Sequence, residues 1–360
     1  MRRLLTLPLL LPKLCIASLL LLALCSCSWQ QYLPAPDDPP VPNAVAIDRA
    51  LRVCSLTQGE QPFHLVLSVA TPEHSANDMT AQIELYWLNP LTYRIVVHTR
   101  DFTQVRIVNQ GAVEEHNTGD YYPRWVQNFV DALLDPVPNI ASLRKIPGNV
   151  PIGSAAHACI STSDSSESAD SNSPGPEPDP TRMARICFQD SEPRIASTLN
   201  FSRSIWFDNY AAFGNQQVPY TLVNALPANL QARGHITRLE PLSPADEPLL
   251  KAHEYTLPTD QVLTVLLPES TARSLLVYPA SVTMPIPSAS DSMTVYIRTD
   301  RTGKVREAYR ANSDNGASLY APQDPAVTRA LGFRFKPYSR NGIPLQIEAP
   351  LRLSSKSFLH

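Results

Sequence analysis

Apolar and polar residues alternate with a period of two along residues 46–110, and strand-like segments resume along residues 195–239. In the segment 82–87, for example, Gln82 and Glu84 separate the apolar positions. The alternating segments are short and are separated by residue types that favour turns, such as Asn, Pro, Asp and Gly. This pattern predicts antiparallel strands. The predicted strands are 82–87, 93–98, 105–108, 195–201, 205–213, 218–223 and 230–239.

A helical period appears between the two blocks. It predicts a helix that begins near Pro123 and ends at Asp135-Pro136. Its apolar side consists of Trp125, Val126, Phe129, Val130, Leu133 and Leu134, and its polar side of Gln127, Asn128 and Asp131. Strands on both sides of one helix predict an α+β fold in which a curved antiparallel sheet, a half-barrel, carries a helix.

The C-terminal block, residues 262–360, has a different order of elements. It predicts a strand at 294–299, a turn at 300–303, a strand at 304–310, a helix at 324–331, a strand at 333–337 and a last strand at 343–353. Asn341-Gly342 before the last strand is a strong hairpin signal. The predicted domains are an export segment 1–28, a Pro-rich tether 29–45, a sheet domain 46–240 with a disordered loop 161–182, a linker 241–261 and a small α+β domain 262–360.

The N-terminus carries a targeting signal. Arg2, Arg3 and Lys13 precede or interrupt an apolar stretch that ends at residue 24, and Leu24-Cys25-Ser26-Cys27 follows. This order resembles a bacterial lipoprotein box, in which Cys27 would carry lipid. An uncleaved membrane anchor and plain secretion are the alternatives. All three place the chain in the bacterial cell envelope, facing the periplasm.

Three cysteines lie outside this signal. Cys159 and Cys187 lie in strand-like stretches on either side of the segment 161–180, which is rich in Ser, Asp, Pro and Glu. In an oxidising compartment they are predicted to form a disulfide. Two unrelated buried thiols are the alternative. Cys54 is left without a pair and is predicted to be a buried thiol.

Composition argues against several classes of function. The formal net charge is −3, and charged residues make up 18% of the chain, so a nucleic-acid partner is not expected. There is no His-Glu-x-x-His pair, no Gly-x-Ser-x-Gly elbow and no glycine-rich phosphate loop. The prediction is therefore a protein that is not an enzyme and has no cofactor, metal site or catalytic residue. A triad assembled only in space stays an open alternative.

The order of the C-terminal elements resembles the C-terminal domain of the TonB energy-transducer family. The resemblance rests on Val295-Tyr296-Ile297, Gly303-Lys304-Val305, 326–331, Phe333-Arg334-Phe335-Lys336-Pro337 and Asn341-Gly342-Ile343-Pro344-Leu345. It implies strand pairing with a protein partner of the outer-membrane transporter type, for transmembrane transport. The long Pro-rich spacer of the family is replaced here by a folded domain, so coupling to a proton motor is not implied.

The last strand is the predicted partner-binding strand, through Ile343, Leu345, Ile347 and Leu351. Main-chain hydrogen bonds supply the affinity in strand addition. Pro344 and Pro350 cannot donate ladder hydrogen bonds, which favours an edge position. The alternative is that this strand closes the sheet.

The pattern of residues 55–240 resembles the half-barrel of the LolA/LolB-type lipoprotein carriers, an antiparallel sheet wrapped around a helix. This resemblance implies an apolar cavity for a lipid, and Trp87, Trp125, Trp206 and Phe207 are its predicted lining. Ordinary core packing is the alternative for each of them. The second predicted function is accordingly a periplasmic carrier lipoprotein without energy transduction, attached to the membrane through its N-terminus.

Overall fold

The computed structural model describes residues 41–71, 80–150, 158–162, 184–189, 194–200, 203–225, 231–251, 260–279, 292–310 and 325–354. The predicted export segment with Cys27, most of the predicted tether, nearly all of the loop 161–182 and residues 252–259 of the linker lie outside these residues. Among the described residues, no helix is long and apolar enough to span a membrane.

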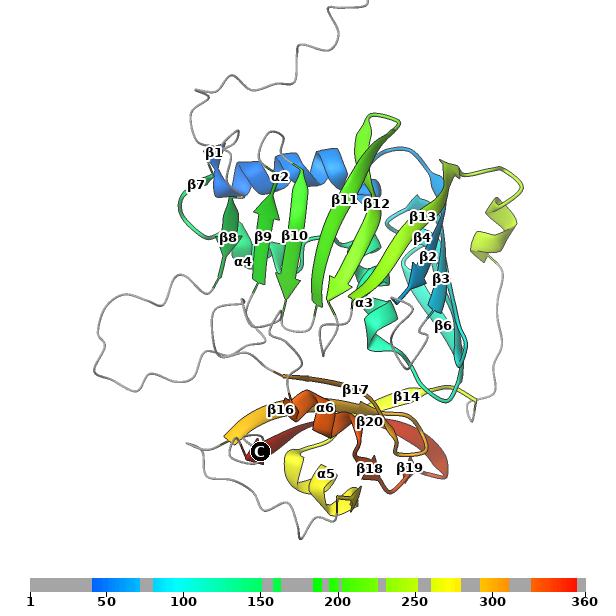
Figure 1. The fold of residues 1–360 in the computed structure, drawn as a ribbon. Helices are drawn as coiled ribbons and strands as arrows, with labels where there is room; N and C mark the ends of the chain where they lie inside the picture. Colours follow the sequence, from blue (N-terminus) through cyan, green and yellow to red (C-terminus); the bar gives the residue numbers. More distant parts are fainter. Residues whose placement is uncertain are drawn as a thin grey trace, which may run out of the picture.

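A curved, open sheet of eleven antiparallel strands forms the larger part of the molecule (Figure 1). In spatial order its strands are β6 (Ala112–Gly119), β5 (Phe102–Asn109), β4 (Thr92–Thr99), β3 (Thr80–Asn89), β2 (Phe63–Ala70), β13 (Gln231–Pro241), β12 (Gln216–Ala225), β11 (Arg203–Phe213), β10 (Ile195–Asn200), β9 (Ala184–Phe188) and β8 (Cys159–Ser161). The predicted antiparallel sheet is confirmed. β13 pairs with β2 and so joins the two blocks that the sequence pattern separates.

Two helices cover one face of this large sheet, which we call the inner face (Figure 1). They are α2 (Asn43–Cys54) and α3 (Arg124–Leu134). α3 is the predicted helix. The sequence patterns do not predict α2, because they assign residues 46–54 to the sheet and residues 29–45 to the tether. That assignment is wrong: Ala46, Ile47 and Ala50 recur at helical spacing and are buried against the sheet.

Short elements complete this part of the chain. They are β1 (Val41–Pro42), η1 (Leu56–Gln58), α4 (Ile140–Leu143), β7 (Asn149–Val150), which pairs with β1, and η5 (Glu247–Lys251).

Phe129 marks the centre of the contact between α3 and the sheet. Its side chain is 0% exposed. The facing position on β13 is Gly234, where an added Cβ would lie 3.1 Å from the Phe129 ring. A glycine inside a strand often marks a close approach of another group. Here the absent side chain lets the ring of Phe129 lie directly on the sheet.

The C-terminal part forms a second, smaller sheet with its own apolar core (Figure 1). Its strands are β14 (Leu263–Leu266), β20 (Ile343–Ser354), β16 (Ser292–Thr299), β17 (Val305–Arg310) and β19 (Tyr338–Arg340). Also present are α5 (Glu269–Leu275), α6 (Pro325–Leu331) and the pair β15 (Leu276–Tyr278) and β18 (Arg334–Phe335). The elements follow the predicted order. Separate folding of the two parts stays a prediction.

The edge position predicted for the last strand is wrong. β20 pairs with β14 on one side, over Leu345–Glu348, and with β16 on the other. Leu345, Ile347 and Leu351 are buried, and Ile343 is half-buried. Beyond the end of β14, Glu269 of α5 accepts the backbone N–H of Arg352. The backbone nitrogens of Pro350 and Arg352 lie on the same side of β20, and no strand pairs with β20 on that side beyond the end of β14. Pro350 is tolerated inside the sheet because its nitrogen does not have to donate a hydrogen bond to a neighbouring strand.

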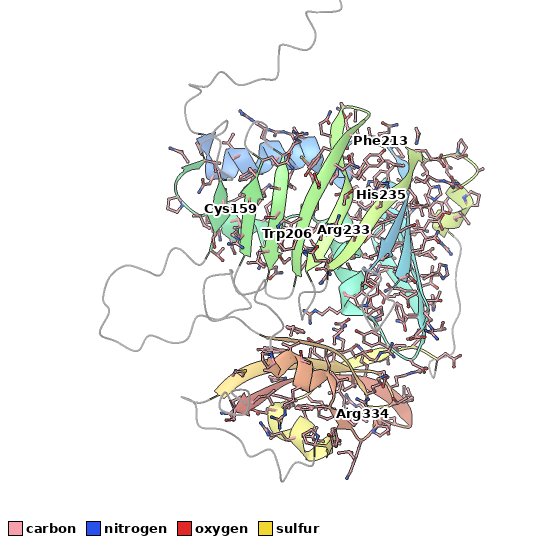
Figure 2. The ribbon with its side chains drawn as sticks, viewed as in Figure 1. Cys159, Trp206, Phe213, Arg233, His235 and Arg334 are labelled. Atoms are coloured by element: carbon pink, nitrogen blue, oxygen red, sulfur yellow. A yellow bond between two sulfur atoms is a disulfide. The ribbon has the colours of Figure 1, made fainter. Side chains whose placement is uncertain are left out.

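The structure joins Cys159 and Cys187 by a disulfide between the edge strand β8 and its neighbour β9 (Cys159 is labelled in Figure 2). We expect replacement of both by serine to lower the free energy of unfolding by about 3–4 kcal/mol, because the bond closes a long loop in the unfolded chain. Urea unfolding of the wild type with and without a reducing agent measures the same loss. A double variant that still responds to the reducing agent would contradict the assignment.

Candidate functional site

The register of the sheet decides which predicted cavity residues face inward. Phe207 pairs with Leu222, which pairs with Gly234 under Phe129, so these positions share the inner face. Trp206 pairs with Val223, which pairs with Arg233. Arg233 is exposed, and this second set lies on the outer face (Figure 2). The prediction that Trp206 lines a cavity is therefore wrong, because neighbouring residues of a strand point to opposite faces.

Trp87 and Trp125 face inward but belong to the packed core. Each is 5% exposed. The ring of Trp87 stacks on Phe63 at 6.1 Å and on Tyr93 at 5.1 Å. Trp125 lies in the first turn of α3 and packs into the same core. Ordinary core packing, the alternative for these two tryptophans, is what the structure shows.

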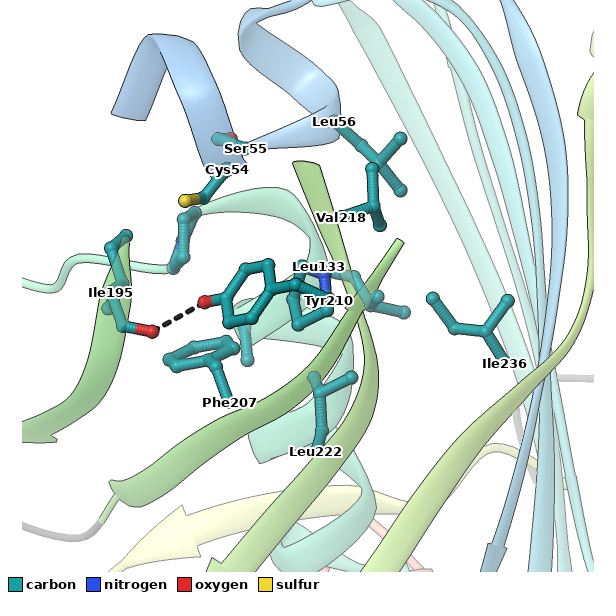
Figure 3. A pocket seen from close by; sticks show the side chains of 13 residues that line it. Cys54, Ser55, Leu56, Leu133, Ile195, Phe207, Tyr210, Val218, Leu222 and Ile236 are labelled. Atoms are coloured by element: carbon teal, nitrogen blue, oxygen red, sulfur yellow. Dashed lines mark hydrogen bonds between the residues drawn. The ribbon is translucent and has the colours of Figure 1, made fainter. Parts of the chain in front are cut away.

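Phe207 lines a small cavity where the C-terminal ends of α2 and α3 meet the inner face (Figure 3). We call it the inner cavity. Its lining is largely apolar and consists of Cys54, Ser55, Leu56, Ala132, Leu133, Pro136, Ile195, Phe207, Tyr210, Val218, Pro219, Leu222 and Ile236. Its volume is ≈ 20 Å³, about the space of one water molecule. An acyl chain does not fit in a space of this size.

The polar groups of the inner cavity are neutral and hydrogen-bonded. The hydroxyl of Tyr210 donates to the carbonyl of Ile195 (Figure 3). Burial raises the pKa of Tyr210 well above its ordinary value, and the neighbouring Cys54 thiol acts in the same direction. Cys54 is buried, as predicted. A cavity of this kind suits an apolar chain better than a charged reactant.

A second, larger space runs along the polar side of α3, and we call it the α3 cleft. Its volume is ≈ 680 Å³, within the range of about 300–1,000 Å³ that is usual for small-molecule sites. Its lining is Tyr122, Arg124, Gln127, Asn128, Asp131, Leu134, Asp135, Pro138, Asn139, Asn200, Arg203 and Arg298. The end of α3 thus separates the two spaces, since Leu133 faces the inner cavity and Leu134 the α3 cleft.

Arg203 lies at the end of the α3 cleft near the C-terminus of α3. It is 7% exposed. One of its terminal nitrogens donates to the Asp135 carbonyl oxygen at 3.1 Å. Burial lowers the pKa of the Arg203 guanidinium, while the carboxylates of Asp131 and Asp135 act in the opposite direction. This end of the cleft therefore combines one cation with two carboxylates.

The other end of the α3 cleft joins the two sheets. Glu348 of β20 accepts hydrogen bonds from Arg124 of α3 at 2.5 Å and from Arg298 of β16 at 2.5 Å and 3.2 Å. Tyr309 also donates to Glu348, at 3.1 Å. Burial by itself raises the pKa of Glu348, but the two arginines outweigh it and hold that pKa below its ordinary value. A carboxylate shared by two arginines holds the small sheet against α3.

Two further contacts hold the start of α3. Gln346 bonds the backbone of Tyr122 twice, accepting from its N–H at 2.8 Å and donating to its carbonyl at 3.2 Å. Glu307 accepts the backbone N–H of Trp125 at 3.2 Å. A carboxylate at a helix N-terminus is favourable because it meets unpaired N–H groups and the positive end of the helix dipole. The small sheet therefore caps α3.

Within the described ranges, no group of three or more His, Cys, Asp or Glu side chains could hold a metal ion. The absence of catalysis, the lipid on Cys27 and a partner protein stay predictions. Sequence patterns gave no sign of the α3 cleft, because its residues come from α3, β10, β11 and β16, which are far apart along the chain.

No protein-family model matches the chain, and no curated protein matches it. Similar solved structures include a LolA-superfamily protein from Nitrosomonas europaea, 6% identical, with a TM-score of 0.32, covering 56% of this chain and 94% of its own. A putative outer membrane lipoprotein-sorting protein domain from Vibrio parahaemolyticus is 11% identical, with a TM-score of 0.33, covering 58% and 97%. A DUF1329 family protein from Desulfovibrio piger is 7% identical, with a TM-score of 0.35, covering 58% and 99%.

Scores of this size leave the family of the chain unassigned. They do not test the resemblance of residues 55–240 to the LolA/LolB-type carriers, which stays a prediction. None of the comparisons matches the TonB family, so strand pairing with an outer-membrane transporter for transmembrane transport stays a prediction without support.

Proposed function

We propose that the chain is a carrier of the bacterial cell envelope that binds an acyl chain, of a lipid or of a lipoprotein, between the inner face of the large sheet and its two helices. The observation that carries this proposal is the inner cavity, an apolar space at the point where the ends of α2 and α3 meet β10–β13. Binding requires the end of α3 to move, because the closed volume of ≈ 20 Å³ is too small for a chain.

The contacts of α3 suit such a movement. Its apolar side lies on the inner face. Burial of apolar surface is not directional, so an acyl chain can replace this side of the helix there at little cost in free energy. Its polar side and its first turn are held by the small sheet through Glu348, Gln346 and Glu307. The N-terminal end of α3 is thus the more strongly held end. The C-terminal end beside the two spaces is held by hydrogen bonds from Thr57 to the Leu134 carbonyl and from Arg203 to the Asp135 carbonyl, and opening breaks these two bonds.

Filling the inner cavity tests this function. We expect Leu222→Trp to weaken binding of the fluorescent fatty acid cis-parinaric acid at least tenfold, because the larger side chain fills the inner cavity, which Leu222 lines. The matched control is Val223→Trp, which places the same side chain on the outer face of the same strand. Thermal melting verifies that both variants are folded.

Two results would reject the carrier function. One is that the wild-type chain does not bind the fatty acid at all. The other is that Leu222→Trp and Val223→Trp bind it as well as the wild type does, which would place any bound chain outside the inner cavity.

A further inference from the structure

Three polar atoms on the inner face, near the α3 cleft, are buried without a hydrogen-bond partner. They are Nε of Arg203, Oγ1 of Thr198 and Oδ1 of Asn224. The exposed fractions of these residues are 7%, 1% and 0%. An unpaired buried polar group is unfavourable because it has lost its hydrogen bonds to water without gaining others. Several in one place indicate a site whose partner is a ligand.

The strand register groups these residues. Thr198 pairs with Ile205, and Ile205 pairs with Asn224, so the side chains of Thr198 and Asn224 share the inner face with Ile205. Arg203 lies two residues before Ile205 on β11 and therefore has the same orientation. Asn224 also donates to the carbonyl of Trp125 at 3.2 Å, which places it beneath α3 and fixes Oδ1 as its unpaired atom.

A ligand that pairs with these atoms must carry both a hydrogen-bond acceptor and a hydrogen-bond donor. Arg203 Nε is a donor and needs an acceptor, whereas Asn224 Oδ1 is an acceptor and needs a donor. The nearby charges have the same mixed character, since Asp131 and Asp135 accompany the Arg203 cation. An anionic group without a cation of its own would add uncompensated negative charge to these two carboxylates, and a purely cationic group would leave Arg203 Nε unpaired.

The apolar inner cavity lies next to Arg203, Thr198 and Asn224 along the same strands. Phe207 follows Ile205 on β11, and Leu222 precedes Asn224 on β12, each by two residues. Two residues of a strand span about 7 Å. Polar and apolar ends of one ligand could therefore lie side by side on the inner face once the end of α3 has moved.

From this arrangement, and resting on the proposed carrier function, we infer that the ligand is a zwitterionic phospholipid with a primary ammonium group. Its phosphate accepts a hydrogen bond from Arg203 Nε, its ammonium donates to Asn224 Oδ1, and its acyl chains extend towards Phe207 and Leu222. The head group thus provides partners for two of the three unpaired atoms, Arg203 Nε and Asn224 Oδ1.

Isothermal titration of the purified full chain tests the inference with four probes. They are dihexanoyl phosphoethanolamine, dihexanoyl phosphoglycerol, free phosphoethanolamine and decanol, which supplies a chain without a charged head. We expect the phosphoethanolamine lipid to bind at least tenfold more tightly than the phosphoglycerol lipid. Arg203→Met, Arg203→Lys and Asn224→Leu should each abolish most of this preference and leave decanol binding unchanged.

Arg233→Met is the matched control, because it removes an exposed arginine from the outer face of the same sheet. It should leave the affinities for all four probes unchanged. Equal binding of the two lipids would overturn the inference, and so would an unchanged preference in Arg203→Lys and Asn224→Leu. If decanol still binds in these cases, the carrier function is not rejected. Free phosphoethanolamine binding as tightly as the lipid would overturn the lipid as the ligand. Failure of all four probes, decanol included, would reject the carrier function itself.

Discussion

Replacing Glu348 by alanine is expected to lower the free energy of unfolding by about 3–5 kcal/mol, because it leaves two partly buried arginines without their shared carboxylate. The side chain of Glu348 is 14% exposed, and Arg298 and Arg124 are 10% and 26% exposed. Since Arg124 belongs to α3, the variant should also release the start of this helix. Urea unfolding measures the first effect, and hydrogen exchange of the α3 amides measures the second.

The same site gives a pH dependence with a definite sign. The pKa of Glu348 in the folded chain lies below its ordinary value of 4.5. Its contribution to stability is therefore fully present above pH 4.5 and is lost as the pH falls through the folded pKa. The difference in stability between the wild type and Glu348→Gln should accordingly shrink as the pH is lowered below 4.5.

Glu269 supplies the matched control. Its side chain is 16% exposed and bonds two arginines, Arg273 at 2.8 Å and Arg352 at 2.7 Å, but all three residues lie in the small sheet and α5. We expect Glu269→Ala to destabilise the small sheet without faster exchange in α3. Equal exchange of α3 amides in the two variants would show that Glu348 does not hold the helix.

Replacing Phe129 by alanine is the second large effect, with an expected loss of about 3–5 kcal/mol. Phe129 is 0% exposed and lies at the centre of the contact between α3 and the inner face. The cavity left behind cannot collapse easily, because the facing residue is Gly234, which has no side chain to move into it. Denaturant unfolding measures the loss, and Phe213→Ala, at a half-buried position, should cost much less.

A double-mutant cycle with Gly234 separates this packing from other effects. An added Cβ at Gly234 meets the Phe129 ring at 3.1 Å and Leu67 at 3.0 Å, so Gly234→Ala alone should destabilise the wild type through overpacking. In the Phe129→Ala background the same change fills part of the vacated space and should cost less. Strict additivity of the two changes would contradict direct packing of this ring on the sheet.

Local patterns were sufficient for most elements but not for α2. A period of two in the apolar residues predicts strands of the large sheet, and a period of nearly four predicts α3. Residues 43–54 also have a helical period, but Val41-Pro42 and a Pro-rich stretch precede them, and no side chain caps the helix. Packing of Ile47 and Ala50 against the sheet makes this helix stable, which is a tertiary contribution that the sequence does not display.

The sequence by itself determined the antiparallel sheet, the helix α3, the order of the C-terminal elements and the pairing of Cys159 with Cys187, because each depends on periodicity, turn residues or compartment. Only the tertiary structure decided that Trp206 faces outward, that β20 lies inside its sheet and that Glu348 and Arg203 meet α3. Strand register and the docking of one sheet against another bring together residues that are far apart in the chain. The candidate site is made of such contacts, so no local sequence pattern predicts it.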